Sequence, residues 1–181
     1  MANKKHYLIV SLTLGAIAAS SAVLIGLTNL VTKDRIIQNE NEKINKGIRQ
    51  IFGDNAVFSE NKDKSKPTEG YTYVKYFYTI IDDGDACLGY ALRTTGFNAY
   101  GKVSLIVGFN CDNLAFIGTY TIVNEQTYAS TLNENYLIPL NDGERQLDDV
   151  SCGATYGAKL VRDMVKEAQS AINSMDELKG N

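Results

Sequence analysis

The feature that most constrains this chain is a run of 26 residues, Tyr7 to Thr32, without a single Asp, Glu, Lys or Arg. A helix needs about 20 apolar residues to cross the hydrocarbon core of a membrane. Lys4 and Lys5 precede the run and Lys33 follows it, so charges flank it at both ends. The run therefore predicts one N-terminal helix that spans a lipid bilayer.

A cleaved signal peptide is the alternative, because the stretch AIAASSAV contains the small residues of a cleavage site. The apolar region of a signal peptide covers only about 7–15 residues, whereas this one continues through Leu30 and Val31. We therefore expect an uncleaved anchor. Its orientation stays open, because basic residues near its C-terminal end outnumber Lys4 and Lys5, and long domains are translocated despite such charges.

The composition of the remaining chain excludes several classes of function. The formal net charge is −3 and acidic and basic residues are interspersed, so no basic stripe indicates a nucleic-acid partner. The only histidine, His6, precedes the apolar run. The remainder therefore lacks histidine-based catalytic groups and the usual zinc ligands. We predict no catalytic side chain and no metal site, and redox chemistry in this domain would need a bound cofactor.

Three cysteines leave two alternatives open. Cys87 and Cys111 would form a disulfide in an exported domain, since disulfides persist in oxidising compartments. The more common outcome for apolar cysteines is that all three, Cys152 included, stay reduced and partly buried.

Hydrophobic patterning predicts an α+β domain after the apolar run. Ile37, Ile44, Ile48 and Ile51 recur on one face of a helix over residues 33–52, and Gly53 is a typical helix stop. Aromatic and β-branched runs separated by turn residues predict strands, and a second helical periodicity closes the chain. The predicted strands are 71–80, 86–95, 102–109 and 114–122, with a loop at 96–101, a long irregular segment at 124–147 and a helix at 156–173.

The segment Asp148–Tyr156 reads DDVSCGATY and lies directly before the last predicted helix. Gly153 and Ala154 are small enough for a bulky group to approach the backbone. Thr155 presents a hydroxyl at a helix N-terminus, where free N–H groups and the helix dipole favour a phosphate. The alternative is a Thr that caps the helix after a turn.

Asp149 to Thr155, D-x-x-x-G-A-T, resembles the flavinylation motif of the FMN-binding domain family. Members include the RnfG subunit of Rnf electron transport complexes and a related subunit of sodium-translocating NADH:quinone reductases. The resemblance extends to GLTNLVTKDRI at 26–36, GKVSLIVG at 101–108 and NEQT at 124–127. The chain departs from the family at Cys152, where Ser or Thr is usual, and at Tyr156, which replaces a small residue.

The resemblance implies an electron-transfer subunit of a membrane-bound Rnf-type complex. Such complexes couple electron flow between ferredoxin and NAD to sodium or proton transport. A flavin transferase, using FAD as donor, would attach FMN to Thr155 through a phosphoester bond. The fold implied is a single transmembrane helix followed by an extracytoplasmic FMN-binding domain with an antiparallel sheet and flanking helices. Residues 1–32 would form the cytoplasmic stub and transmembrane helix, 33–58 a juxtamembrane helix and linker, and 59–181 the FMN-binding domain.

The predicted cofactor site contains five residues. Thr155 is the acceptor, and the small residues Gly153 and Ala154 leave space for the flavin group. Glu125 and Thr127 would lie near the flavin ring. Asp149 would help the transferase recognise the site, or would simply hold a turn. Lys159 would reach the phosphate or stay solvated, and Tyr156 would stack on the flavin or serve as an ordinary tyrosine.

Two other functions remain open. The first is a free-standing flavinylated surface protein for extracellular electron transfer, with the same chemistry at Thr155. The second is an anchored binding module without a cofactor. NAD binding by this chain is not expected, because no GxGxxG follows a predicted strand and no P-loop occurs.

Overall fold

The computed structural model describes residues 2–60, 70–84 and 86–174. The chain forms two compact units, Met1–Glu42 and Lys43–Asn181. The predicted domain boundary at residues 58 and 59 falls inside the first strand of the second unit.

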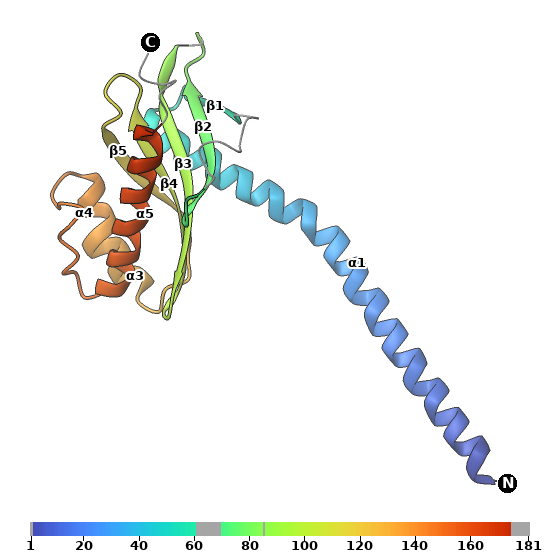
Figure 1. The fold of residues 1–181 in the computed structure, drawn as a ribbon. Helices are drawn as coiled ribbons and strands as arrows, with labels where there is room; N and C mark the ends of the chain where they lie inside the picture. Colours follow the sequence, from blue (N-terminus) through green and yellow to red (C-terminus); the bar gives the residue numbers. More distant parts are fainter. Residues whose placement is uncertain (1, 61–69, 85, 175–181) are drawn as a thin grey trace. The chain divides into compact units, whose positions relative to one another are not determined.

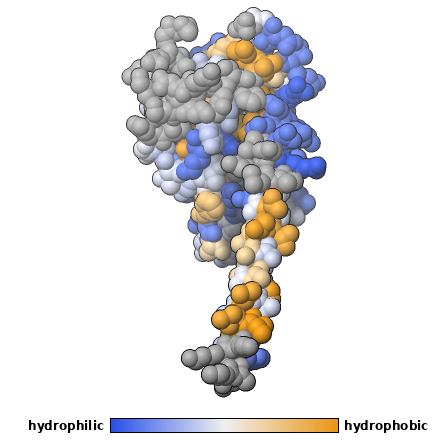
Figure 2. Space-filling model, turned by 90° about the vertical axis from the view of Figure 1, so that its right-hand side faces the viewer, coloured by the Kyte–Doolittle hydropathy of each residue, from blue (hydrophilic) through white to orange (hydrophobic). Residues whose placement is uncertain are grey.

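The first unit is the N-terminal part of helix α1 (Ala2–Phe52). Its segment His6–Asn29 has a mean hydropathy of 2.3 and no buried residue, so it is long and apolar enough to cross a membrane once. Figure 2 shows hydrophobic side chains along this helix. The hydroxyls of Ser20, Ser21 and Thr28 donate hydrogen bonds of 2.7–2.9 Å to carbonyls four residues earlier. These bonds satisfy polar groups that would otherwise be costly in lipid.

The second unit contains a five-stranded antiparallel sheet whose strands follow one another in chain order. The strands are β1 (Val57–Glu60), β2 (Val74–Ile81), β3 (Cys87–Asn98), β4 (Gly101–Asn110) and β5 (Phe116–Asn124). Four of them were predicted. The fifth, β1, has only four residues, too few for a clear alternating pattern. Its register is set by pairing with β2, from Val57 opposite Ile81 to Glu60 opposite Tyr78.

The loop predicted at residues 96–101 is wrong. The strands β3 and β4 continue to pair through Phe97 opposite Lys102 and Asn98 opposite Gly101. Only Ala99 and Tyr100 remain for the turn. Gly101 has a φ of +133°, a backbone conformation that a residue with a side chain rarely adopts. Gly101 therefore serves a tight hairpin, whereas Gly96 lies within β3 opposite Val103.

One face of the sheet is covered by helix α5 (Thr155–Asn173) and by three short helical segments (Figure 1). These segments are α3 (Ala129–Leu132), the π-helical η1 (Asn133–Leu137) and α4 (Ile138–Asn141). The predicted face of α5 is confirmed, since Ala158, Val161, Val165, Ala168 and Ile172 are all buried. The inward residues of β4 meet them: Val103, Leu105, Val107 and Phe109.

The segment 124–147, predicted to be irregular, is largely helical. Leu132, Tyr136, Leu137 and Leu140 are all buried in the same core as α5. Their spacing fits a helix, but the polar residues between them conceal the short pattern in the sequence.

The other face of the sheet packs against residues 43–52 of α1, which belong to the second unit. Ile44 and Ile48 are 3% and 1% exposed, as their spacing predicted, and they share a cluster with Ile80 and Ile106. A Cβ atom at Gly108 would lie 2.5 Å from Ile51 Cγ2. A glycine in the interior strand β4 therefore lets the helix approach the sheet closely. The helix ends at Phe52, as predicted from the glycine that follows it.

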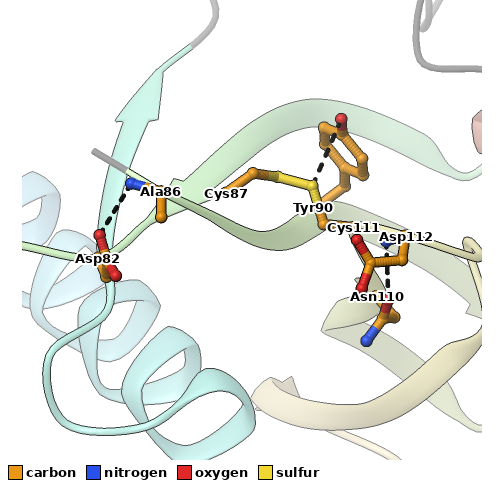
Figure 3. Close-up of a disulfide and its surroundings, with 7 residues drawn as sticks. All are labelled: Asp82, Ala86, Cys87, Tyr90, Asn110, Cys111 and Asp112. Atoms are coloured by element: carbon orange, nitrogen blue, oxygen red, sulfur yellow. Dashed lines mark hydrogen bonds between the residues drawn. A yellow bond between two sulfur atoms is a disulfide. The ribbon is translucent and has the colours of Figure 1, made fainter. Parts of the chain in front are cut away.

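Cys87 and Cys111 form a disulfide that joins the start of β3 to the residue after β4 (Figure 3). The more common alternative, three reduced cysteines, is therefore wrong for this pair, while Cys152 stays free and buried. The hydroxyl of Tyr90 lies 3.9 Å from Cys111 Sγ. Pairing was hard to foresee because the register of β3 and β4, which brings these two strand ends together, is a tertiary feature.

We expect Ile48→Ala to lower the free energy of unfolding of the second unit by about 2–5 kcal/mol, since it leaves a cavity between helix and sheet. The matched control is Ile17→Ala in the apolar span, where the side chain is 64% exposed. Thermal unfolding followed by near-ultraviolet circular dichroism in detergent would measure both. Equal midpoints for the two variants would contradict the packing of Ile48 against the sheet.

Candidate functional site

The candidate site is a cavity of about 300 Å³ at the N-terminus of α5. Three segments contribute to it: the β3–β4 turn, the loop after β5, and the residues at the start of the helix. Its lining residues are Tyr100, Gln126, Tyr128, Gly153, Ala154, Thr155, Tyr156 and Gly157. Three of the five predicted site residues therefore lie together in one cavity: Gly153, Ala154 and Thr155.

The start of α5 leaves backbone donors at this cavity. Thr155 is the first residue of the helix, and Ala154 occupies the cap position without a side-chain hydrogen bond. The first turn of a helix has N–H groups without intrahelical acceptors and carries a partial positive charge. Thr155 therefore does not cap the helix, and its half-buried side chain lies beside the free donors. Gly153 has a φ of +82°, which directs the chain into the helix.

The loop before the helix is held in place by a set of polar contacts. Arg145 forms an ion pair of 3.0 Å with Asp149 and donates a hydrogen bond of 2.9 Å to the Asp149 carbonyl. Asp149 Oδ1 accepts a bond of 3.4 Å from the Ser151 N–H. Asp149 thus holds the turn, while its part in recognition by a transferase stays a prediction. The hydroxyl of Tyr136 donates to the carbonyl of Leu147, and burial raises the pKa of Tyr136 far above its ordinary range, so it stays a donor.

A buried amide connects the three segments that form the cavity. The side-chain N–H groups of Gln126 donate to the Gly101 carbonyl and, at 3.1 Å, to Asn98 Oδ1. Asn98 in turn donates a bond of 3.2 Å to the carbonyl of Tyr156 on α5. Gln126 is only 6% exposed. The chain of bonds therefore fixes the loop after β5, the hairpin and the helix relative to one another.

Glu125 and Thr127 contribute through their backbones. The N–H of Glu125 donates a bond of 2.8 Å to Lys102 O, and the N–H of Thr127 donates one of 2.9 Å to Tyr100 O. Neither residue lines the cavity. Their contact with a flavin ring stays a prediction, as does the flavin on Thr155.

Aromatic rings form much of the cavity wall. The rings of Tyr100 and Tyr156 stack with centroids 5.3 Å apart and planes 27° apart. Lys159 Nζ lies 5.7 Å from the centroid of the Tyr156 ring, so the lysine approaches an aromatic face. Sequence reasoning missed Tyr100, Gln126 and Tyr128 as lining residues. The only signal was their position beside the glycine-flanked turn and the long segment after β5.

The described residues contain no group of three His, Cys, Asp or Glu side chains placed to hold a metal ion. An organic cofactor is the kind of group that the lining residues of this cavity would suit.

We expect Gln126→Leu to lower the free energy of unfolding by about 1–3 kcal/mol, because it leaves the Gly101 carbonyl without its side-chain donor. Thr72→Ala, which truncates an exposed side chain away from the cavity, is the control and should change stability little. Urea unfolding of the full chain in detergent would compare them. The bridging role of Gln126 is refuted if both variants unfold at the same urea concentration.

Comparison with known families gives one match. The family model for the RnfG N-terminal region matches residues 1–51, which comprise the apolar span and nearly all of α1. No curated protein matches the chain. The match includes residues 26–36 and supports the predicted resemblance over this part of the chain. Residues 1–51 are thus similar to the N-terminal region of RnfG.

Proposed function

We propose that this protein is the electron-transfer subunit of a membrane-bound Rnf-type oxidoreductase and carries FMN covalently on Thr155. The complex would couple electron flow between ferredoxin and NAD to sodium or proton transport. The observation that carries the proposal is the position of Thr155, a hydroxyl residue in a cavity at the uncapped N-terminus of α5. The family match at residues 1–51 supports the membership of such a complex.

The residues present fit a flavin phosphoester. The free N–H groups of the first turn of α5 suit a phosphate held by Thr155. Gly153 and Ala154 present no large side chain at the approach to that hydroxyl. The cavity volume, about 300 Å³, is at the small end of the range of about 300–1,000 Å³ for ligand pockets. A ring in it would stay partly open to solvent, which suits electron exchange with neighbouring subunits.

Attachment would transfer the FMN part of FAD to the Thr155 hydroxyl. The Thr155 oxygen bonds to the phosphorus on the FMN side of FAD, the pyrophosphate bond breaks, AMP leaves, and the hydroxyl proton is released. When bound, FMN supplies one-electron redox chemistry. The protein's own residues hold the phosphate at the helix N-terminus and fix the cavity walls through Gln126 and Asn98.

The disulfide supports an extracytoplasmic location for the second unit. Cytosolic thiols are kept reduced, whereas disulfides form and persist outside the cytoplasm. The Cys87–Cys111 pair therefore favours a cytoplasmic N-terminus and an exported C-terminal domain. Charge counting around the span left this orientation open.

Intact-mass spectrometry tests the acceptor. Full-length protein co-expressed with a flavin transferase should gain the mass of one FMN less one water. Thr155→Ala should gain nothing, because it lacks the hydroxyl that becomes the ester oxygen. Thr72→Ala, at an exposed threonine that does not line the cavity, is the matched control and should be modified like the wild type.

Two outcomes would contradict the proposal. Unmodified wild-type protein would favour an anchored binding module without a cofactor, and a modified Thr155→Ala variant would move the acceptor elsewhere. Co-purification with other membrane subunits separates a complex from a free-standing flavinylated surface protein, which would purify alone.

Thiol labelling in intact cells tests the orientation. Cys87 and Cys111 should resist alkylation until a reductant is added, after which a membrane-impermeant maleimide should label both. Cys87→Ser should lower the free energy of unfolding by about 2–4 kcal/mol, since the disulfide joins residues that are 24 positions apart. Labelling only after cell lysis would place the domain in the cytoplasm, whereas labelling of intact cells without reductant would contradict the disulfide.

A further inference from the structure

Three tyrosines line the cavity from three separate segments. Tyr100 comes from the β3–β4 turn, Tyr128 from the loop after β5, and Tyr156 from α5. They are 39%, 56% and 63% exposed. Large apolar rings gathered at one surface cavity are typical of sites that bind ligands or partners.

The backbones of two of these tyrosines are held by hydrogen bonds to their carbonyls. The carbonyl of Tyr100 accepts from the N–H of Thr127 at 2.9 Å and from its hydroxyl at 3.3 Å. The carbonyl of Tyr156 accepts from Asn98 at 3.2 Å. Because the cavity is present with the Tyr100–Tyr156 pair already stacked, a planar group entering it need not separate the two rings. The aromatic wall is therefore preorganised.

The charged side chains near the cavity favour some classes of planar ligand over others. The described residues that line the cavity carry no acidic or basic side chain. A cation does approach these rings, since Lys159 Nζ lies 5.7 Å from the centroid of Tyr156. A cationic ligand would compete with this lysine for the ring face, whereas an uncharged or anionic aromatic ligand would gain from it.

We infer that Tyr100, Tyr128 and Tyr156 form the binding surface for the isoalloxazine ring, an inference that rests on the proposed attachment of FMN to Thr155. Tyr156 directly follows Thr155, so consecutive residues would hold the phosphate and contact the ring. This surface would keep the ring at the mouth of the cavity rather than free in solvent.

Contact between these rings and a flavin has an optical consequence. A tyrosine in contact with excited flavin donates an electron to it, and the electron then returns, which quenches the fluorescence without net reaction. Phenylalanine stacks equally well but is a much poorer donor. Stacking also restrains the flavin ring and raises the anisotropy of its fluorescence.

The test uses the flavinylated full-length protein in detergent, with intact mass verifying one FMN in every variant. Wild-type flavin should be strongly quenched and should rotate with the protein. Tyr156→Leu and Tyr100→Leu, and above all the double variant, should lose quenching and anisotropy. Tyr156→Phe should lose quenching but keep anisotropy. Tyr76→Leu is the control, because Tyr76 is 38% exposed and lies outside the cavity, and it should match the wild type.

The outcomes separate the inference from the proposed function. A wild-type protein without the added mass refutes both. One FMN with the same fluorescence lifetime and anisotropy in the wild type, the Leu variants and the Tyr76 control refutes the tyrosine surface alone. Thermal midpoints of the Leu variants, measured in the same preparation, exclude unfolding as the cause of any loss.

Discussion

The structure of the second unit depends on the burial of the central strands on both faces. All residues of β4 from Val103 to Phe109 are buried, so this strand requires cover above and below. Residues 43–52 of α1 cover one face, and α5 with the short helices covers the other. Removing either layer would expose apolar residues of β4, and burial of such side chains contributes about 1.5–3 kcal/mol each.

The same packing places the candidate site. The core contacts of α5 determine where its first turn lies, beside the β3–β4 hairpin and the loop after β5. A Cβ atom at Gly157 would approach Leu132 Cδ2 to 3.0 Å, so the helix start is packed tightly against α3. Hydrophobic burial brings the three segments together. The directional bonds of Gln126 and Asn98 then set the fine geometry of the cavity, which burial alone does not specify.

The sequence predicted those features that rest on regular patterns. The face of α5, the burial of Ile44 and Ile48, four strands and the N-terminal span follow from periodicity and length. The missed features depend on contacts distant in the chain. The strand β1 is held by β2, the hairpin extends because its residues pair, and η1 is helical because Tyr136 and Leu137 enter the core. The surface formed by Tyr100, Tyr128 and Tyr156 depends on three such long-range placements, so no local sequence pattern predicts it.

The chemical character of the cavity bears on how a flavin would reach Thr155. A threonine hydroxyl is a weak nucleophile and needs a base for phosphoryl transfer. Among the described lining residues there is no His, Asp, Glu or Lys to act as one. Asp149 is engaged with Arg145 and Ser151 in the preceding loop. On the proposed function, the described lining residues supply no such base, which agrees with attachment by a separate flavin transferase. On that proposal, the domain would present the Thr155 hydroxyl and hold the product.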